Sequence, residues 1–288
     1  MAYCMIDTVA DERIPTHRAA VQKIFEDAPV FLDNASTPLD LRFRLFGFSV
    51  RVTPWFWIVM AILGRDTLRD RDLGALAMVV WVVCGFISIL VHELGHSISA
   101  RWFRCPSQIV LIAFGGYAEY YNGAPPSGWR RLLVALAGPI AGFLLFGFVL
   151  LSDLSLNWAG KHLVLSRFYF YLLVQNLVWS LFNLLPIFPL DGGKALREIL
   201  YICGVRQPDP PTYTVSIIVS GLLVVAGLMK LLRQDLGILG WLPFIPDPLM
   251  LVWFGLFGVQ NYQLLQQSRQ FKSWDEPDDD NTPWARRR

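Results

Sequence analysis

The sequence predicts an α-helical polytopic membrane protein with about six transmembrane segments and a small β element. Three observations support this fold class. The 288-residue chain is 54% hydrophobic, with a mean hydropathy of +0.43. Only 17% of its residues are charged, whereas a soluble domain carries about 25%. The apolar residues are also gathered in blocks, as expected for an integral membrane protein.

Composition divides the chain into three regions. Residues 1–41 are mixed and polar, and we interpret them as a solvated N-terminal arm without a cleaved signal peptide. Residues 42–265 hold the apolar blocks and form the predicted membrane-embedded domain. Residues 266–288 are rich in charge and are predicted to be a disordered C-terminal tail.

The membrane-embedded domain contains six apolar segments, at about 53–64, 73–103, 130–152, 166–185, 213–232 and 238–262. The first is shorter than the roughly 20 residues of a full span, so it must draw on its flanks. The third contains Ala137-Gly138-Pro139, and a proline inside a span is tolerated where neighbours satisfy the freed carbonyl.

Two stretches outside these segments favour β-structure. Residues 42–52 partly alternate between apolar and polar side chains, which predicts a short strand leading into the membrane. Residues 107–121 are predicted to form two short strands around Gly115-Gly116.

The distribution of basic residues predicts the orientation in the membrane. Six spans place both termini on one side, together with residues 101–131 and 194–206. That side holds 18 of the 25 Lys and Arg residues, so the positive-inside rule assigns it to the cytoplasm.

The stretch His92-Glu93-Leu94-Gly95-His96 lies near the end of the second apolar segment. At 3.6 residues per turn, the two histidines lie on one helix face, where their nitrogens can share a Zn²⁺ at about 2.0–2.1 Å each. Glu93 is placed to act as the base toward a metal-bound water, which is the usual interpretation of H-E-x-x-H. Three ionisable side chains in an apolar run cost a few kcal/mol each unless they have a function, so a chance match is disfavoured.

A catalytic zinc usually has a third protein ligand. The remaining histidines, His17 and His162, lie in the polar arm and in a loop predicted to face away from the cytoplasm. Asp191 is better placed, because prolines and glycines around it allow the chain to bend back into the protein interior. The alternative is a simple helix stop with a solvated Asp191.

These motifs resemble the site-2 protease family of intramembrane zinc metalloproteases. The resemblance rests on His-Glu-Leu-Gly-His in an apolar helix, followed by Asn183-x-x-Pro186-x-x-Pro189-Leu190-Asp191-Gly192-Gly193. Phe114-Gly115-Gly116 and Ala137-Gly138-Pro139 add weaker agreement, and the likeness covers about residues 42–206. The chain resembles a minimal form, without the PDZ or CBS domains of some relatives.

The resemblance implies one Zn²⁺ per chain, with His92, His96 and Asp191 as ligands and Glu93 as the catalytic base. It implies that Asn183 helps to hold the substrate or its oxyanion. The strands around Phe114, Gly115 and Gly116 are expected to receive the substrate as an added strand.

The chain departs from the family pattern at two positions. Thr53 precedes Pro54 where a histidine is common, and Gly142 stands where an asparagine often follows the Ala-Gly-Pro motif. Neither position is expected to contact the metal.

The expected function is therefore zinc-dependent cleavage of a transmembrane protein substrate by a multi-pass protein of the cell membrane, in contact with membrane lipid. Two alternatives are a catalytically silent membrane scaffold and a zinc transporter. The net charge of +2, without a basic face, argues against nucleic acid as a partner. Nothing in the sequence indicates an oligomeric state.

Overall fold

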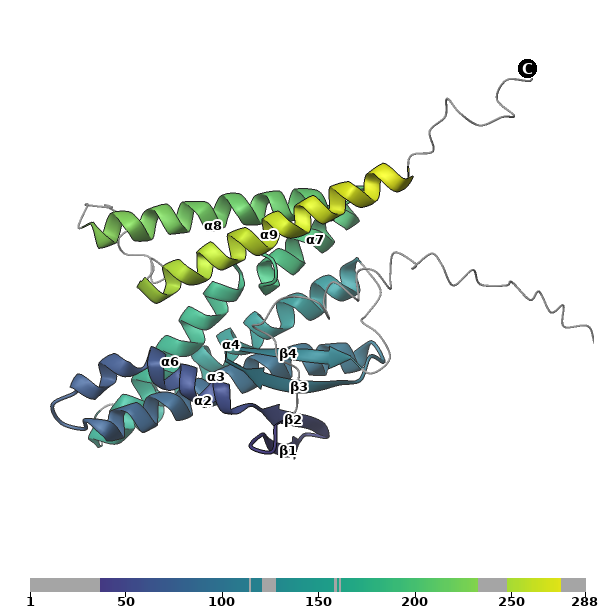
Figure 1. The fold of residues 1–288 in the computed structure, drawn as a ribbon. Coiled ribbons are helices and arrows are strands. Elements are labelled where there is room, and N and C mark those ends of the chain that lie inside the picture. Colours follow the sequence, from purple (N-terminus) through teal and green to yellow (C-terminus); the bar gives the residue numbers. More distant parts are fainter. Residues whose placement is uncertain are drawn as a thin grey trace, which may run out of the picture. The chain divides into compact units, whose positions relative to one another are not determined.

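The computed structural model describes residues 37–113, 115–120, 128–157, 160, 162–232 and 248–275. Within these ranges the chain is mostly helical and contains one small sheet (Figure 1), as predicted. Most of the predicted N-terminal arm and residues 276–288 of the predicted tail lie outside the described residues.

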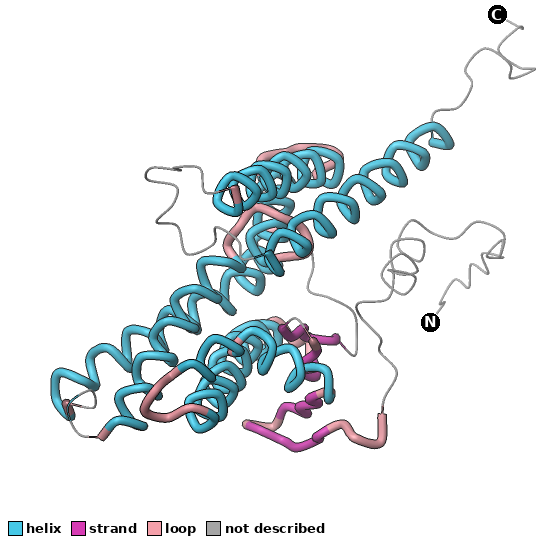
Figure 2. The backbone as a smooth tube through the Cα atoms, turned by 60° about the vertical axis from the view of Figure 1, so that its left-hand side comes forward, coloured by secondary structure: helices cyan, strands magenta, loops and turns pink. Residues whose placement is uncertain are grey.

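The sheet has four strands, β1 (Leu41–Leu45), β2 (Phe48–Val52), β3 (Ser107–Ile112) and β4 (Gly115–Tyr120), in the order β1-β2-β3-β4. The outer pairs are antiparallel, whereas β2 and β3 are parallel. The strands lie together beside the helices (Figure 2). Two stretches that are distant in sequence therefore form one sheet.

The single strand predicted over residues 42–52 is instead a hairpin. Phe46 and Gly47 form its two-residue turn, with φ angles of 49° and 82°. Two successive positive φ angles are typical of the tight turn that matches the twist of a hairpin, and glycine adopts the second without strain.

The sheet packs against the helices through one apolar face. Alternate residues of β2 (Phe48, Val50 and Val52) are buried, as expected for a half-buried strand. They form a core with residues from the first two helices and from β3, namely Phe56, Met60, Ile89, Leu90, Leu94, Ile109 and Leu111.

The N-terminal helices are α2 (Pro54–Leu63), a 3₁₀ turn η1 (Arg65–Arg69), and α3 (Ala75–Trp102). With 28 residues, α3 is about 42 Å long, which exceeds the roughly 30 Å of a bilayer's hydrocarbon core. Helix α2 is only about 15 Å long, so it cannot cross a bilayer alone.

Helices α4 (Trp129–Leu156) and α6 (Leu163–Asn183) both pack against α3. Gly95 of α3 brings that helix close to α4. A Cβ at Gly95 would lie 2.4 Å from the carbonyl oxygen of Ala137, so only glycine permits this approach.

After α6, residues 184–190 turn sharply and lead into α7 (Asp191–Ile202). The peptide bond between Phe188 and Pro189 is cis. Residues 194–206, which lie between two predicted spans and for which no secondary structure was predicted, are helical up to Ile202. An amphipathic helix forms there because it buries one face, including Ala195 and Glu198, against α4.

The chain ends in a helical pair, α8 (Asp209–Leu231) and α9 (Pro248–Asp275). The predicted tail from residue 266 is helical up to Asp275. Its Gln, Ser and Arg residues continue the helix because they are compatible with helical backbone, and Leu265 is still buried.

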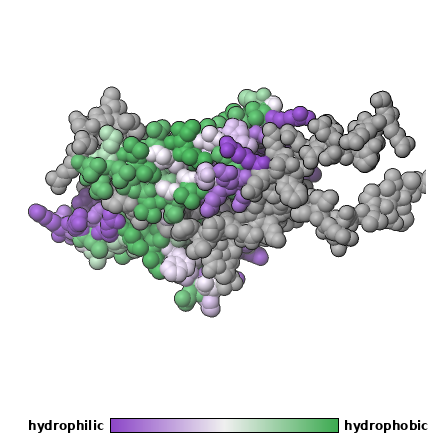
Figure 3. Space-filling view, turned by 45° about the horizontal axis from the view of Figure 1, so that its top comes forward, coloured by the Kyte–Doolittle hydropathy of each residue, from purple (hydrophilic) through white to green (hydrophobic). Residues whose placement is uncertain are grey.

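Among the described helices, α3, α4 and α8 are both long and apolar enough to cross a membrane. Figure 3 shows a broad hydrophobic surface with hydrophilic patches toward its ends. Helix α6 is long enough, but it carries polar residues that face the protein interior. Among these, Asn176 is 1% exposed and donates a hydrogen bond to Ser88 Oγ (2.9 Å). The structure thus supports at least three of the six predicted spans.

Candidate metal centre

Helix α3 places His92 and His96 one turn apart inside the protein. Their Nε2 atoms are 3.2 Å apart, and the two residues are 2% and 7% exposed. Glu93 lies between them in sequence and is also buried. The predicted common helix face is therefore confirmed.

Asp191 completes a group of three metal-binding side chains. Its Oδ2 lies 2.9 Å from His92 Nε2 and 3.1 Å from His96 Nε2, although the residues are almost 100 positions apart. Asp191 is the first residue of α7, where the helix dipole favours a carboxylate. The alternative of a solvated Asp191 at a helix stop is wrong, because the residue is 3% exposed.

The turn before Asp191 is held in place by the C-terminal helices. The Phe188 N–H donates a hydrogen bond to Ser216 Oγ of α8 (2.9 Å), and Asn261 Nδ2 of α9 donates to the Phe188 carbonyl oxygen (2.6 Å). A Cβ at Gly193 would lie 2.4 Å from the Phe188 nitrogen, so glycine is needed for the helix to start this close to the turn. These contacts position the Asp191 carboxylate.

The three ligand atoms fit a zinc ion. Neighbouring ligands of a tetrahedral zinc, each about 2.0–2.1 Å from the metal, lie roughly 3.3 Å apart. The observed separations of 2.9, 3.1 and 3.2 Å are within a few tenths of an ångström of this value.

The tautomer of His96 supports the same assignment. Its Nδ1 lies 2.7 Å from the carbonyl oxygen of Val134 on α4, and an N–H at Nδ1 can donate there. A neutral His96 then presents the lone pair of Nε2 toward the carboxylate of Asp191. Nε2 is then left to bind a metal ion together with Asp191 Oδ2, which lies 3.1 Å away.

Gly138 of α4 provides the space for both histidines. A Cβ at this position would lie 2.2 Å from His96 Nε2 and 2.8 Å from His92 Nε2. The Ala137-Gly138-Pro139 motif is thus part of the metal site. From the sequence the motif was only a point of family resemblance, with no predicted role.

Lys194, one helical turn after Asp191, contacts the second oxygen of the same carboxylate. Its Nζ lies 3.3 Å from Asp191 Oδ1, and its side chain is 47% exposed. The ammonium group therefore engages Oδ1 and leaves Oδ2 for the histidines. Sequence reasoning missed this contact, although the i,i+3 spacing could have suggested it.

The start of β4 lies directly against Glu93. A Cβ at Gly116 would lie 2.5 Å from Glu93 Cγ, so glycine allows the strand to approach the carboxylate. Gly115 in turn lies beside the ring of Trp179 on α6, where a Cβ would be 2.9 Å away. The predicted β element is therefore adjacent to the histidine motif.

Trp179 links Asn183, another predicted site residue, to the metal centre. Its ring packs edge-on near that of His92, with centroids 6.5 Å apart, and its carbonyl oxygen accepts a hydrogen bond from Asn183 Nδ2 (3.0 Å). Sequence reasoning missed Trp179, since one aromatic residue among many in an apolar segment carries no distinguishing signal. Phe114 lies outside the described residues.

The departure at Gly142 has a structural explanation. A Cβ at Gly142 would lie 2.1 Å from Ser180 Oγ on α6, so the serine occupies the space that a larger residue would need. Thr53, the other departure, is 4% exposed, and its N–H donates a hydrogen bond to the Leu111 carbonyl oxygen (2.9 Å) where β2 leads into α2.

Comparison with known proteins identifies relatives of this arrangement. The model of Peptidase family M50 matches residues 80–159 and 159–227. A putative zinc metalloprotease of Synechocystis is 30% identical over 256 residues, covering 80% of this chain and 62% of the relative. A zinc metalloprotease of Methanocaldococcus jannaschii is 31% identical over 165 residues, covering 55% of this chain and 44% of the relative. The chain thus spans about half the length of these relatives.

A solved structure shares the fold. The site-2 protease from Methanocaldococcus jannaschii superposes with a TM-score of 0.51 at 22% sequence identity. The match covers 78% of this chain and 95% of that structure. The overall fold of this chain is therefore one already observed in a solved structure.

Proposed function

The chain belongs to Peptidase family M50, and from this premise we propose that it is an intramembrane zinc metalloprotease. It would hydrolyse a peptide bond in or near a transmembrane segment of a membrane-protein substrate. The observation that carries this proposal is the convergence of His92, His96 and Asp191 on three neighbouring buried atoms of a multi-pass membrane protein, with Glu93 beside them.

His92, His96 and Asp191 would hold the zinc, and the hydrogen bond from His96 to Val134 would keep its Nε2 directed at the ion. When bound there, zinc would lower the pKa of a water ligand to near 7 and polarise the scissile carbonyl.

Glu93 is the proposed general base. A carboxylate oxygen of Glu93 takes a proton from the attacking water and then passes it to the nitrogen of the leaving amine. Its burial against Gly116 keeps bulk water away from the carboxylate and limits its side-chain movement. The family premise and the position next to His92 support this role.

The substrate would bind along β4. A transmembrane helix satisfies its own backbone hydrogen bonds, so it must unwind before a peptide bond becomes accessible. Strand β4 ends the sheet order and begins beside Glu93, so a substrate strand added there would recover backbone hydrogen bonds close to the proposed base. Asn183 retains a second amide N–H beyond the one given to Trp179, and this group would orient the substrate carbonyl.

We further propose that the protein lies in the cell membrane with both termini and the metal side in the cytoplasm. The excess of Lys and Arg on that side supports this orientation. A reporter that is active only outside the cytoplasm should stay inactive when fused to the C-terminus, and an active reporter there would refute the orientation.

The decisive experiment is cleavage of a single-span model substrate by the purified protein in detergent. Wild type and Glu93→Gln are compared at equal zinc content, with and without a chelator. We expect cleavage by the wild type alone, and its loss on chelation.

The same experiment separates the alternatives. If both proteins bind one zinc and neither cleaves any substrate tested, the silent scaffold becomes the better description. If Glu93→Gln cleaves as fast as the wild type, the role given to Glu93 is wrong. Zinc uptake into vesicles without proteolysis would favour a transporter.

A further inference from the structure

A cleft separates the C-terminal end of α3 from the N-terminal end of α4, away from the metal centre. It has a volume of about 470 Å³ and is lined by three aromatic and two basic residues, Trp102, Phe103, Arg104, Trp129 and Arg130. None of these five described residues is acidic. The cleft therefore combines an apolar wall with positive charge.

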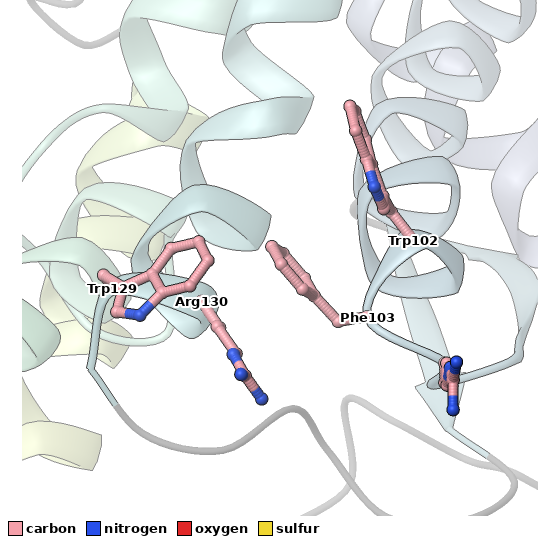
Figure 4. A pocket seen from close by; sticks show the side chains of 5 residues that line it. Trp102, Phe103, Trp129 and Arg130 are labelled. Carbon is pink, nitrogen blue, oxygen red and sulfur yellow. The ribbon is translucent and has the colours of Figure 1, made fainter.

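Three aromatic side chains supply the apolar wall of the cleft. Figure 4 shows Phe103 between Trp129 and Trp102, with the Arg130 side chain extending beneath the rings in this view. Phe103 and Trp129 pack edge to face with centroids 5.4 Å apart, which joins the end of α3 to the start of α4. Trp102 and Trp129 are 85% and 56% exposed, so most of this wall is open to a ligand.

The two guanidinium groups are available to an anion. In the part of the chain that the structure describes, neither Arg104 nor Arg130 forms an ion pair with a carboxylate. The Arg130 guanidinium lies over the Trp129 ring, 5.5 Å from its centroid. The next residue along α4, Arg131, is by contrast engaged with the buried Glu198 at 3.6 Å.

The backbone of Arg104 supports a role for its side chain. Helix α3 ends with hydrogen bonds from the Cys105 N–H to the Ala100 carbonyl and from the Arg104 N–H to the Arg101 carbonyl. This helix stop normally places glycine in the left-handed conformation, and α7 ends in the same way with Gly204 at φ 84°. At α3 the position is occupied by Arg104 at φ 61°, which is unfavourable for a residue with a side chain.

The position of the cleft relative to the membrane restricts the ligand. Both α3 and α4 are of membrane-crossing length, and the cleft lies where one ends and the other begins. One turn further into each helix, Ile98 and Leu133 are also exposed, at 48% and 47%. An apolar surface thus continues from the tryptophans toward the bilayer interior, whereas the guanidinium groups lie at the helix ends.

We propose that this cleft binds an anionic phospholipid from the surrounding leaflet. Arg104 and Arg130 hold the phosphate, and the aromatic wall contacts the glycerol and upper acyl region. The apolar surface that descends along both helices matches acyl chains, which neither free phosphate nor an acidic peptide carries. Because α3 bears the metal-binding histidines and α4 bears Gly138, the bound lipid would brace the two helices that form the metal centre.

The test measures lipid retained by the full-length protein purified in detergent. Native mass spectrometry counts phosphatidylglycerol or phosphatidylcholine molecules bound per chain during titration with each lipid. We expect selective retention of phosphatidylglycerol by the wild type. Substitution of Arg104→Gln or Arg130→Gln should weaken it about fivefold each, which is the effect of one basic residue near an anionic surface.

Two further variants make the result specific. Arg44→Gln removes the same charge from an exposed residue on β1 that does not line this cleft, and it should change retention little. Arg104→Gly should weaken retention while leaving the thermal midpoint unchanged or higher, because glycine relieves the left-handed conformation. A matched loss in both Arg44→Gln and Arg130→Gln would indicate diffuse charge and overturn the proposal.

Competition distinguishes the source of the phosphate. Inorganic phosphate and glycerol phosphate, which carry no acyl chain, should fail to displace phosphatidylglycerol at concentrations where added phosphatidylglycerol exchanges with it. Displacement by either at similar concentrations would assign the cleft to soluble phosphates. Equal retention of phosphatidylglycerol and phosphatidylcholine by the wild type would refute an anionic lipid site.

Discussion

Substitution of Gly138→Ala tests whether α4 shapes the metal centre. The added Cβ would lie 2.2 Å from His96 Nε2, whereas ordinary contacts begin at 3.4 Å. The imidazole, or the helix, must therefore move by about 1.2 Å, several times the roughly 0.2 Å over which metal–ligand distances vary. Loss of a partner outside the ligand set typically weakens metal binding 10–100-fold. Because this change displaces a ligand directly, we expect a loss on the order of 100-fold or more.

The assay is a zinc titration of the metal-free protein against a chromogenic chelator, with the thermal midpoint measured in parallel. The matched control is Gly147→Ala in the same helix, where an added Cβ meets nothing within 4 Å. Alanine there should leave zinc affinity unchanged and raise stability by up to about 1 kcal/mol through helix propensity.

The two substitutions together test whether the histidines need the space at Gly138. A folded Gly138→Ala protein that binds zinc as tightly as wild type would show that the histidines do not need this space. Equal losses of affinity in both variants would instead point to a general sensitivity of α4 to alanine.

Three more predictions follow from the structure. Glu198 accepts hydrogen bonds from the Gly128 N–H (2.6 Å) and from Arg197 (2.7 Å). Glu198→Ala should therefore lower the free energy of unfolding by about 2–3 kcal/mol, and Glu198→Gln by less. Chemical denaturation that finds the variants as stable as the wild type would contradict this. Hydrogen bonds from the Asp72 and Leu73 backbone N–H groups, and the nearby Arg167, lower the pKa of Asp70 from its usual value. Because the folded-state pKa is lowered, the stabilisation by Asp70 is present above the unfolded-state pKa and is lost as the pH falls through the folded-state pKa. The difference in unfolding free energy between wild type and Asp70→Asn should therefore shrink below about pH 4. A difference that stays constant with pH would exclude this linkage. Removal of zinc should lower the thermal midpoint. A metal whose free concentration is 100 times its dissociation constant stabilises the folded state by about 2.7 kcal/mol. Identical melting curves with and without chelator would argue against a bound metal.

Local patterns in the sequence were sufficient to predict the helical fold class and two of the three proposed metal ligands. The apolar blocks predicted α3, α4 and α8 because burial in lipid requires long apolar runs. The pair His92 and His96 was predicted because residues four apart share a face of any helix. Both are properties of the backbone period and need no information about neighbouring segments.

For Asp191, the sequence predicted the role but not the local structure. It was predicted as the third ligand because the other histidines were poorly placed and because of the family resemblance. In the structure its carboxylate lies within 3.1 Å of both histidines. The helix that begins at this residue was missed, because Gly192 and Gly193 disfavour a helix locally. Packing of α7 against α4 outweighs that preference, and glycine is required there by the close approach of the preceding turn.

The tertiary structure alone decided what surrounds the ligands. The space left by Gly138, the carbonyl of Val134 and the ring of Trp179 reach the histidines from other helices. The parallel pairing of β2 with β3 likewise joins segments more than 50 residues apart and brings β4 beside Glu93. Such contacts depend on how helices and strands pack in three dimensions, and no periodicity along the chain records which residues will meet.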